Sequence, residues 1–382
     1  MSKKNKKKIR VPLRKNLDKT PRQRAELAQQ IDEDHDLDRF HQDERLSRKG
    51  AVTRHRTILA ADETPAGETP LRDVDAAACL AGRVISPRGA EYLIEADDGR
   101  LFNCTVRRLL QSLASADRTA VAAGDRVLFR PAAETRAGRA PQGVIERIEP
   151  RRGILTRKIR GQKHVLVANV DQVLIVASAA DPPLKPSLVD RYLISAAAGG
   201  IRPVICINKV DLADLVELQP VIGTYSQLGY DIVPTSIVTG IGISRLKCLL
   251  SGRETALAGQ SGVGKTSLIN ALEPGLDLKT LEVAAETRKG KHTTTSARLL
   301  KLSFGGWVVD TPGIRQMELW DVVPEEVEGY FLEFHPFLRE CRYPGCSHTH
   351  ESRCGVKRAV VRGLITHQRY ESYCRIRTGA GD

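Results

Sequence analysis

One octapeptide of the chain matches the phosphate-loop pattern G-x-x-x-x-G-K-[ST] at every position: Gly259-Gln260-Ser261-Gly262-Val263-Gly264-Lys265-Thr266. It follows the apolar run Thr255–Ala258 and precedes Ser267–Leu272, which has the composition of a helix. The pattern requires this context, because its glycines turn backbone N–H groups towards phosphates and the helix N-terminus favours their charge. The loop therefore predicts an α/β fold with a largely parallel sheet, in which ligands bind at the carboxyl ends of the strands.

Individual roles follow from the chemistry of the loop. Lys265 is expected to bridge the β- and γ-phosphates and to take part in catalysis, and the Thr266 hydroxyl is expected to bind Mg²⁺. The other candidate nucleotide contacts from this segment are Gly259, Gln260, Ser261, Gly262, Val263, Gly264 and Ser267.

A second apolar run, Trp307–Asp310, leads into Asp310-Thr311-Pro312-Gly313. A carboxylate at this strand end suits a partner of bound Mg²⁺, and the Gly313 N–H can contact the γ-phosphate. The D-x-x-G pattern alone is weak, but together with the phosphate loop it indicates a nucleoside-triphosphate switch.

The segment between these two motifs, Arg288–Thr295, is polar and cationic and should form a mobile loop. A threonine here, with Thr294 as our candidate, would ligate Mg²⁺ only while the γ-phosphate is present. Ile314 follows D-x-x-G and cannot orient the attacking water, so His292 is the candidate for that role. The alternative is an ordinary exposed basic loop in which His292 has no catalytic role.

The tetrapeptide Asn208-Lys209-Val210-Asp211 closes another apolar run and indicates the base. Asp211 can accept hydrogen bonds from guanine N1–H and N2–H₂, whereas adenine offers neither donor. Asn208 can contact the N7/O6 side of guanine, and the aliphatic stem of Lys209 can lie over the guanine ring. The run Asp231–Pro234 leads to Thr235-Ser236, where Ser236 is the candidate for the far face of guanine. These residues predict GTP rather than ATP.

The guanine motif precedes the phosphate loop, the reverse of the usual order. The same parts can occupy the same places if the chain is circularly permuted. We therefore expect a circularly permuted P-loop GTPase domain over residues 156–316.

Five short β-like runs between residues 76 and 152 predict a small closed barrel of the OB type, with an SH3-like barrel as the alternative. They are Gly82–Ile85, Glu91–Glu95, Leu101–Val106, Gly124–Phe129 and Gly143–Ile148. OB barrels often stack nucleic-acid bases on aromatic side chains. Since this segment offers few aromatics, we expect contacts by charge and shape more than by stacking.

The C-terminal part contains Cys341-x4-Cys346-x-His348-x5-Cys354. Three thiolates and one imidazole match a closed tetrahedral Zn²⁺ site, which would be structural because no ligand position stays open. His350 is a possible substitute for His348, and buried thiols beside a surface histidine are the alternative.

The excess of positive charge lies at the N-terminus. Met1–Arg24 holds eleven Lys or Arg residues against Asp18 alone, whereas the whole chain has a net charge of +13. Such a tail is expected to be disordered. It could aid solubility, neutralise nucleic-acid phosphates or, less favourably, bind an acidic membrane surface.

Neither a secretory signal nor a membrane-spanning helix is expected from the sequence. No apolar stretch follows the basic N-terminus, and the longest apolar run, Val173–Ala180, is too short to span a membrane. We expect a cytoplasmic protein without a membrane partner, whose cysteines are reduced thiols or metal ligands.

From about Ala76 to Ile376 the chain resembles the YjeQ/RsgA family of circularly permuted ribosome-assembly GTPases. The resemblance rests on the permuted order of the GTPase motifs, the barrel with Gly124–Val127, and the Cys/His cluster followed by Cys354–Lys357 and Arg369-Tyr370. It implies an N-terminal OB domain, a central GTPase domain and a C-terminal zinc domain.

The resemblance also implies a function. It implies a late role in maturing the small ribosomal subunit, binding to its 16S-type rRNA, and activation by the subunit. We expect domains at 76–155, 156–316 and 317–382 after a basic extension over 1–75, one Zn²⁺ per chain, Mg²⁺ bound with GTP, and a monomer. The alternatives are a GTP-sensing RNA-binding adapter with little hydrolysis and a structural module with a degenerate nucleotide site.

Overall fold

The computed structural model describes residues 8–12, 55–59, 74, 76–107, 121–132, 141–159, 162–276, 297–310 and 324–379. The chain divides into one compact unit of residues 1–75 and 107–120, and a second of residues 76–106 and 121–382. In the first, β1 (Lys8–Pro12) pairs antiparallel with β2 (His55–Leu59), which the sequence did not predict. The rest of the basic extension lies outside the described residues.

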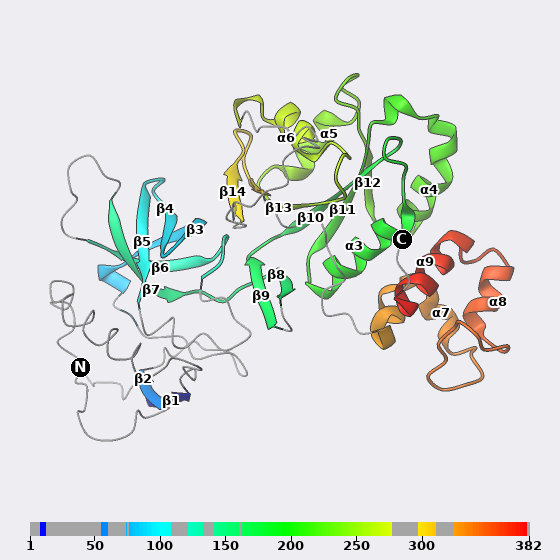
Figure 1. The fold of residues 1–382 in the computed structure, drawn as a ribbon, viewed down its shortest axis with the longest axis horizontal. Coiled ribbons are helices and arrows are strands. Elements are labelled where there is room, and N and C mark those ends of the chain that lie inside the picture. The colour runs from blue at the N-terminus through cyan, green and yellow to red at the C-terminus, as the bar shows by residue number, and fades with distance from the viewer. Residues whose placement is uncertain are drawn as a thin grey trace, which may run out of the picture. The chain divides into compact units, whose positions relative to one another are not determined.

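Residues 76–148 contain a closed five-stranded barrel, drawn in cyan in Figure 1. It begins with the 3₁₀ turn η2 (Ala76–Ala78), and its strands are β3 (Leu80–Arg88), β4 (Glu91–Ala96), β5 (Leu101–Val106), β6 (Arg126–Pro131) and β7 (Gln142–Ile148). The order is β3-β4-β5-β7-β6, with β5 parallel to β7 and β6 pairing back to β3. A meander would pair β5 with β6, so the observed order is that of the OB barrel.

Two details of the barrel refine the predictions from sequence. The Phe102 and Phe129 rings pack in the core with centroids 5.0 Å apart, so neither is available to stack on a base. The strand predicted to begin at Gly124 begins at Arg126. Gly124 has φ +86°, and a Cβ there would lie 2.1 Å from the Ala168 carbonyl oxygen, so the chain turns at a close backbone contact.

Between barrel and sheet, β8 (Leu155–Ile159) and β9 (Gln162–Val167) form a separate antiparallel hairpin. No sequence pattern predicted this hairpin.

The central sheet has the order β12-β11-β10-β13-β15-β14 and is parallel except for β14 (Figure 1). Its strands are β10 (Gln172–Ser178), β11 (Arg202–Asn208), β12 (Asp231–Pro234), β13 (Glu254–Ala258), β14 (Arg298–Lys301) and β15 (Trp307–Asp310). The predicted strands are confirmed within a few residues. The sequence did not predict the edge strand β14. Its residues Arg298–Lys301 have only two buried positions and form no continuous apolar run.

Helices cover both faces of this sheet. They are α3 (Pro186–Ala198), α4 (Leu215–Gln227), α5 (Ile243–Leu250) and α6 (Lys265–Leu272), with the 3₁₀ turns η3 (Val210–Leu212) and η4 (Pro274–Leu276). Side chains alternate along β10: Val173 and Ile175 pack with α3 and α4, whereas Leu174 and Val176 pack with α5 and α6. Burial on both faces explains why the strands are continuously apolar.

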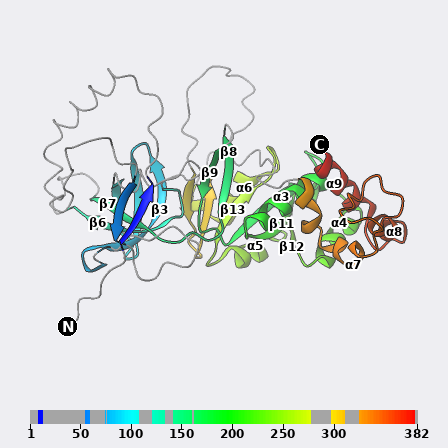
Figure 2. The same cartoon turned by 90° about the horizontal axis from the view of Figure 1, so that it is seen from below.

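A helical region follows the sheet. It comprises η5 (Pro324–Tyr330), η6 (Leu332–Phe334), α7 (His335–Leu338), α8 (Gly355–Val361) and α9 (His367–Thr378). Its core holds Phe331, Phe334 and Tyr373, whose ring centroids lie 4.9–5.3 Å apart. Figures 1 and 2 both show α9 beside α3, and contacts between these helices join the region to the sheet. The predicted domain limits stay predictions.

Among the described residues the longest helices, α3 and α4, have 13 residues each. None of the described helices has the length and apolarity that crossing a membrane requires.

Candidate functional site

The predicted nucleotide-binding residues follow strands that end at the same edge of the sheet. Since β10, β11, β12, β13 and β15 are parallel, their carboxyl ends meet there. The phosphate loop follows β13, the guanine motif follows β11, and Thr235-Ser236 follows β12. The sheet thus assembles at one edge motifs that lie about 50 residues apart in the chain.

The phosphate loop needs its glycines. Gly259 has φ +138°, and a Cβ would lie 2.2 Å from the Val176 carbonyl oxygen. Gly264 has φ +90°, and a Cβ would lie 2.6 Å from Asn208 Nδ2. Gly262 also has a positive φ of +85°. Larger residues would therefore push the loop away from β10 and from the guanine motif.

Lys265 and Thr266 start α6, directly after the loop. Lys265 Nζ donates to the carbonyl oxygens of Gly259 at 2.7 Å and Gln260 at 2.6 Å. These bonds hold the ammonium group over the loop, the position from which it could contact bound phosphates. Thr266 and Ser267 are half-buried in the first turn of the helix, where the Thr266 hydroxyl suits a Mg²⁺ that accompanies the nucleotide.

Asn208 joins the guanine motif to the phosphate loop. It is 1% exposed, its Nδ2 donates to the Val263 carbonyl oxygen at 2.9 Å, and its Oδ1 accepts from Thr235 Oγ1 at 3.1 Å. Cys206 Sγ in turn lies 3.2 Å from Thr235 Oγ1. The side-chain amide is therefore held in one orientation before any base arrives.

Lys209 and Asp211 are placed differently from Asn208. Lys209 adopts φ +60°, and its Nζ donates to the Asp181 carbonyl oxygen in the loop between β10 and α3. Asp211 lies in η3 and is exposed, so its carboxylate is accessible to a base. The contact with Asp181 could not be found from sequence, because it joins two loops 28 residues apart without any shared pattern.

Ser236 is fully buried and shapes its own loop. Its N–H donates to the Ile241 carbonyl oxygen at 3.0 Å, and its Oγ accepts from the Thr239 N–H at 3.1 Å. The structure therefore places Ser236 beside the guanine motif as a residue that supports the loop, and its contact with the base stays a prediction.

Asp310 ends β15 and pairs with Arg298, which places its backbone at the same edge of the sheet. His292, Thr294 and Gly313 lie outside the described residues, so their predicted roles stay predictions.

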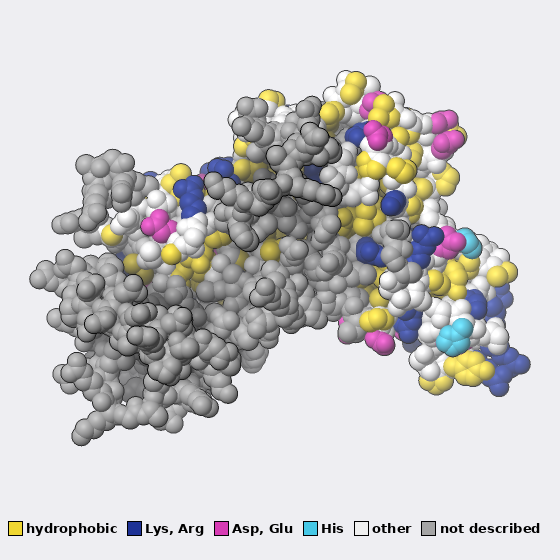
Figure 3. Space-filling model, in the orientation of Figure 1, with side chains coloured by type: hydrophobic (Ala, Val, Ile, Leu, Met, Phe, Trp, Pro, Cys, Tyr) yellow, Lys and Arg dark blue, Asp and Glu magenta, His cyan; other side chains and the backbone are white. Residues whose placement is uncertain are grey.

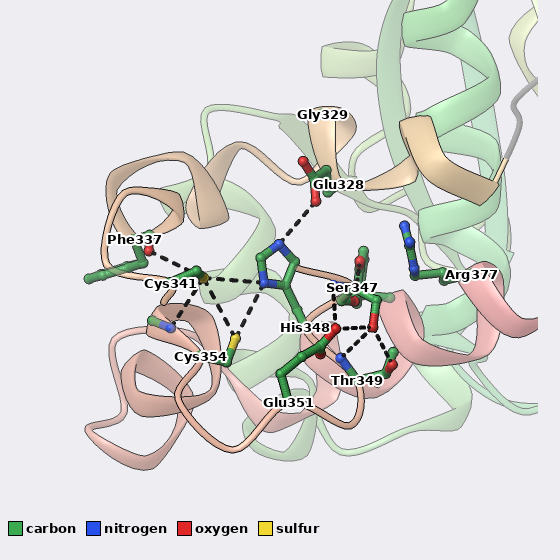
Figure 4. Close-up of polar contacts among 12 residues, drawn as sticks. Glu328, Gly329, Phe337, Cys341, Ser347, His348, Thr349, Glu351, Cys354 and Arg377 are labelled. Atoms are coloured by element: carbon green, nitrogen blue, oxygen red, sulfur yellow. Dashed lines mark hydrogen bonds and ion pairs between the residues drawn. The ribbon is translucent and has the colours of Figure 1, made fainter. Parts of the chain in front are cut away.

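The four predicted metal ligands come together in one cluster: ligand atoms of Cys341, Cys346, His348 and Cys354 all lie within 4.8 Å of one another. Figure 4 shows three of them, Cys341, His348 and Cys354. Cys341 Sγ is 3.9 Å from Cys354 Sγ, and His348 Nδ1 is 3.5 and 3.3 Å from these two sulfurs. With ordinary Zn–S and Zn–N bonds, tetrahedral ligand atoms are about 3.5–3.8 Å apart, so the cluster could hold a structural zinc.

Surrounding groups orient these ligands. His348 Nε2 lies 3.0 Å from Glu328 Oε2, which turns Nδ1 towards the sulfurs. Backbone N–H groups of Gly355 and Lys357 donate to the sulfurs of Cys341 and Cys354 at 3.3 and 3.4 Å. Such donors stabilise thiolates.

The structure also decides between the two histidines. The His348 side chain is 3% exposed, whereas that of His350 is 82% exposed and lies outside the cluster. Burial raises the pKa of the Cys346 thiol to about 12, so its deprotonation at neutral pH depends on a bound cation.

Comparisons with known proteins agree with this arrangement. The family model described as "RsgA GTPase" matches residues 148–320. "Small ribosomal subunit biogenesis GTPase RsgA 1" of Vibrio vulnificus is 40% identical over 301 residues, covering 77% of this chain and 82% of that protein. "Small ribosomal subunit biogenesis GTPase RsgA" of Yersinia pseudotuberculosis is 37% identical and covers 84% of this chain and 90% of that protein.

Solved structures resemble the chain as well. YjeQ from Thermotoga maritima matches with a TM-score of 0.63 and 37% identity, covering 79% of this chain and 98% of that one. YloQ, described as a circularly permuted GTPase, matches with a TM-score of 0.60 and 27% identity, covering 81% and 97%. The predicted permutation of the GTPase fold is confirmed.

Proposed function

Because this chain belongs to the RsgA GTPase family, we propose that it hydrolyses GTP while bound to the small ribosomal subunit and assists a late step in the maturation of that subunit. The observation that carries the proposal is the bond from Asn208 to the Val263 carbonyl oxygen. It joins the part that selects guanine to the part that binds phosphates, which is what a working guanine-nucleotide site requires.

We propose 16S-type rRNA as the contact on the subunit. Exposed arginines lie in and beside the segment that carries the zinc cluster: Arg339, Arg342, Arg353, Arg358 and Arg362. Figure 3 shows Lys and Arg side chains on the surface of this region. Neutralised phosphates supply most of the affinity of such surfaces for RNA. The protein would act as a monomer in the cytoplasm, where ribosomal subunits are assembled.

The remaining catalytic roles are part of the proposal. Thr294 would bind Mg²⁺ while the γ-phosphate is present, and Gly313 would contact that phosphate. His292 would orient the attacking water, since Ile314 cannot. In a His292→Ala variant we expect GTP binding to persist and subunit-stimulated hydrolysis to be lost. Full stimulated hydrolysis would eliminate the role.

The function is tested by measuring phosphate release from GTP with and without purified small subunits. We expect slow turnover by the isolated protein, strong stimulation by subunits, and no stimulation when ATP replaces GTP. Large ribosomal subunits serve as the matched control. Equal rates of phosphate release with and without small subunits, combined with GTP-dependent binding to them, would contradict the GTPase proposal. That result would favour the alternative, a GTP-sensing RNA-binding adapter with little hydrolysis.

A further inference from the structure

A buried charged cluster lies where α9 packs against α3. Asp190 on α3 is 0% exposed and Arg369 on α9 is 2% exposed, and the guanidinium donates to the Asp190 carboxylate. Arg369 also donates to Glu333 through Nε at 2.6 Å and through a second nitrogen at 3.2 Å. The zinc-binding region therefore supplies the cation that neutralises a buried carboxylate of the GTPase sheet.

Tyr225 on α4 joins the same cluster. Its hydroxyl lies 2.7 Å from Asp190 Oδ1 and 3.2 Å from the carbonyl oxygen of Pro186, the first residue of α3. The guanidinium of Arg369 lies 4.3 Å from the centroid of the Phe331 ring and 5.8 Å from that of Tyr225. Asp190 is thus the point at which α3, α4 and α9 are joined by polar bonds.

Burying these charges is expensive, and a buried ion pair often contributes no net stability over apolar packing. Burial works against the charge of Arg369, but Asp190 and Glu333 outweigh it and hold the guanidinium pKa above its ordinary value. Burial raises the pKa of the Asp190 carboxyl, whereas Arg369 and the hydrogen bonds from Ser372 and Tyr225 act in the opposite direction, so the charged form of Asp190 requires these partners. What such a cluster provides is one defined position for the three helices rather than additional stability.

Both helices of the GTPase sheet in this cluster begin at the guanine site. The loop before α3 contains Asp181, whose carbonyl oxygen accepts from the Lys209 ammonium group. The same loop lines a small cavity with Gln260 and Val263 of the phosphate loop. Helix α4 begins four residues after Asp211. A shift of α3 against α4 would therefore change the contact between the loop before α3 and Lys209, whose stem is expected to lie over the base.

We infer that Arg369 is a positioning residue through which the zinc-binding region controls how tightly the guanine site holds its nucleotide. This inference rests on the proposed function and concerns the regulation of the same site. When a bound partner draws α9 away, Asp190 loses its cation, α3 and α4 lose their common anchor, and GDP dissociates faster. With α9 in place, the loop before α3 keeps its contact with Lys209 and GDP is retained.

The test measures dissociation of a fluorescent GDP analogue from the full-length, zinc-loaded chain. Tyr225→Phe removes only the hydroxyl, and Arg369→Lys keeps the charge but not the two-carboxylate fork. We expect dissociation to be about three- to tenfold faster in both variants, the effect of losing about one hydrogen bond. Arg375→Lys is the matched control, because Arg375 is an exposed arginine of the same helix, and its rate should not change.

Two further readouts separate positioning from general damage to the structure. Zinc content should stay unchanged in all variants. In Tyr225→Phe and Arg369→Lys, turnover at saturating GTP should stay unchanged while the KM for GTP shifts. Added small subunits should accelerate GDP dissociation from the wild type and have less effect on Arg369→Lys. Unchanged dissociation in both variants, an equal effect in Arg375→Lys, or full acceleration of Arg369→Lys by subunits would overturn the inference. GDP dissociation from the isolated variants requires neither hydrolysis nor subunits, so it is judged separately from the proposed function.

Discussion

At the scale of single residues, the guanine site depends on groups that differ in burial. Asn208 is buried and bonded on both sides, so its role is to hold the guanine motif against the phosphate loop. The Asp211 side chain is exposed, so its carboxylate is accessible to the ligand. A substitution of Asp211 should therefore change ligand choice rather than folding.

Replacing Asp211 with Asn should weaken GTP and GDP binding by about a hundredfold or more, because guanine needs two acceptors where the amide offers one. Xanthosine nucleotides, which present a carbonyl at this edge, should bind better to the variant than to the wild type. Titration with fluorescent GDP and XDP measures both effects, with Asp214→Asn at the N-cap of α4 as the control. The guanine assignment is wrong if wild-type protein binds ATP as tightly as GTP.

At the scale of elements, the segment that carries the zinc ligands has no regular secondary structure. Residues 339–354 contain no helix or strand in the structure, yet they surround the ligands and pack on α9. Tyr370 and Tyr373 donate to the carbonyl oxygens of His348 and Ser347 at 2.7 and 2.8 Å. A bound metal and α9 would together hold this segment, so loss of the ion should loosen the packing on α9.

Metal analysis of the purified chain should give about one zinc per molecule. The double substitution Cys346→Ala/Cys354→Ala should abolish it, because two ligands cannot hold the ion. Cys248→Ala serves as the control, since Cys248 is an exposed thiol outside the cluster. Retention of a full zinc equivalent by the double variant would contradict the assignment.

At the scale of the whole molecule, charged contacts join the barrel to the sheet. Arg83 of β3 pairs with Glu254 of β13 and lies 5.4 Å from the centroid of the Trp307 ring. Lys301 lies over the same ring and pairs with Glu95 of β4 at 2.6 Å. Trp307 and Lys301 belong to the hairpin that ends at Asp310, so the barrel contacts the strand that leads to the nucleotide switch.

This contact predicts a pH dependence. Burial raises the pKa of Glu254 to about 7, and the attraction of Arg83 only partly offsets it. Between about pH 4.5 and 7 the folded chain keeps a proton that the unfolded chain has lost, so the contribution to the free energy of unfolding falls as pH rises. Urea unfolding at pH 5 and 7.5 should show a smaller decrease for Glu254→Gln than for wild type. An identical decrease in both proteins would refute the assignment.

The basic extension should act on the whole molecule through charge. Deleting residues 1–24 should lower RNA affinity and flatten its dependence on salt, because fewer counterions are released on binding. Filter binding of the full and shortened chains to one RNA at several salt concentrations measures the slopes. Equal slopes would mean that the extension serves solubility instead.

The sequence by itself determined the local chemistry of this protein. The phosphate loop, the guanine tetrapeptide and the Cys/His spacing are short contiguous patterns, because each needs a particular turn or ligand set within a few residues. Continuous apolar runs predicted the parallel strands, since both faces of the sheet are covered. The reversed order of the motifs indicated the permutation. The permutation, the parallel strands and the Cys/His cluster are confirmed, whereas the nucleotide contacts stay predictions.

Only the tertiary structure decided how distant residues meet. No local pattern links Asp190 to Arg369, which is 179 residues away, or Lys209 to the carbonyl oxygen of Asp181. The choice of His348 over His350 and the burial of Phe102 and Phe129 were equally open in the sequence. The reason is physical: these contacts depend on how helices and strands pack in space, and burial, which sets their energies, exists only once the chain has folded.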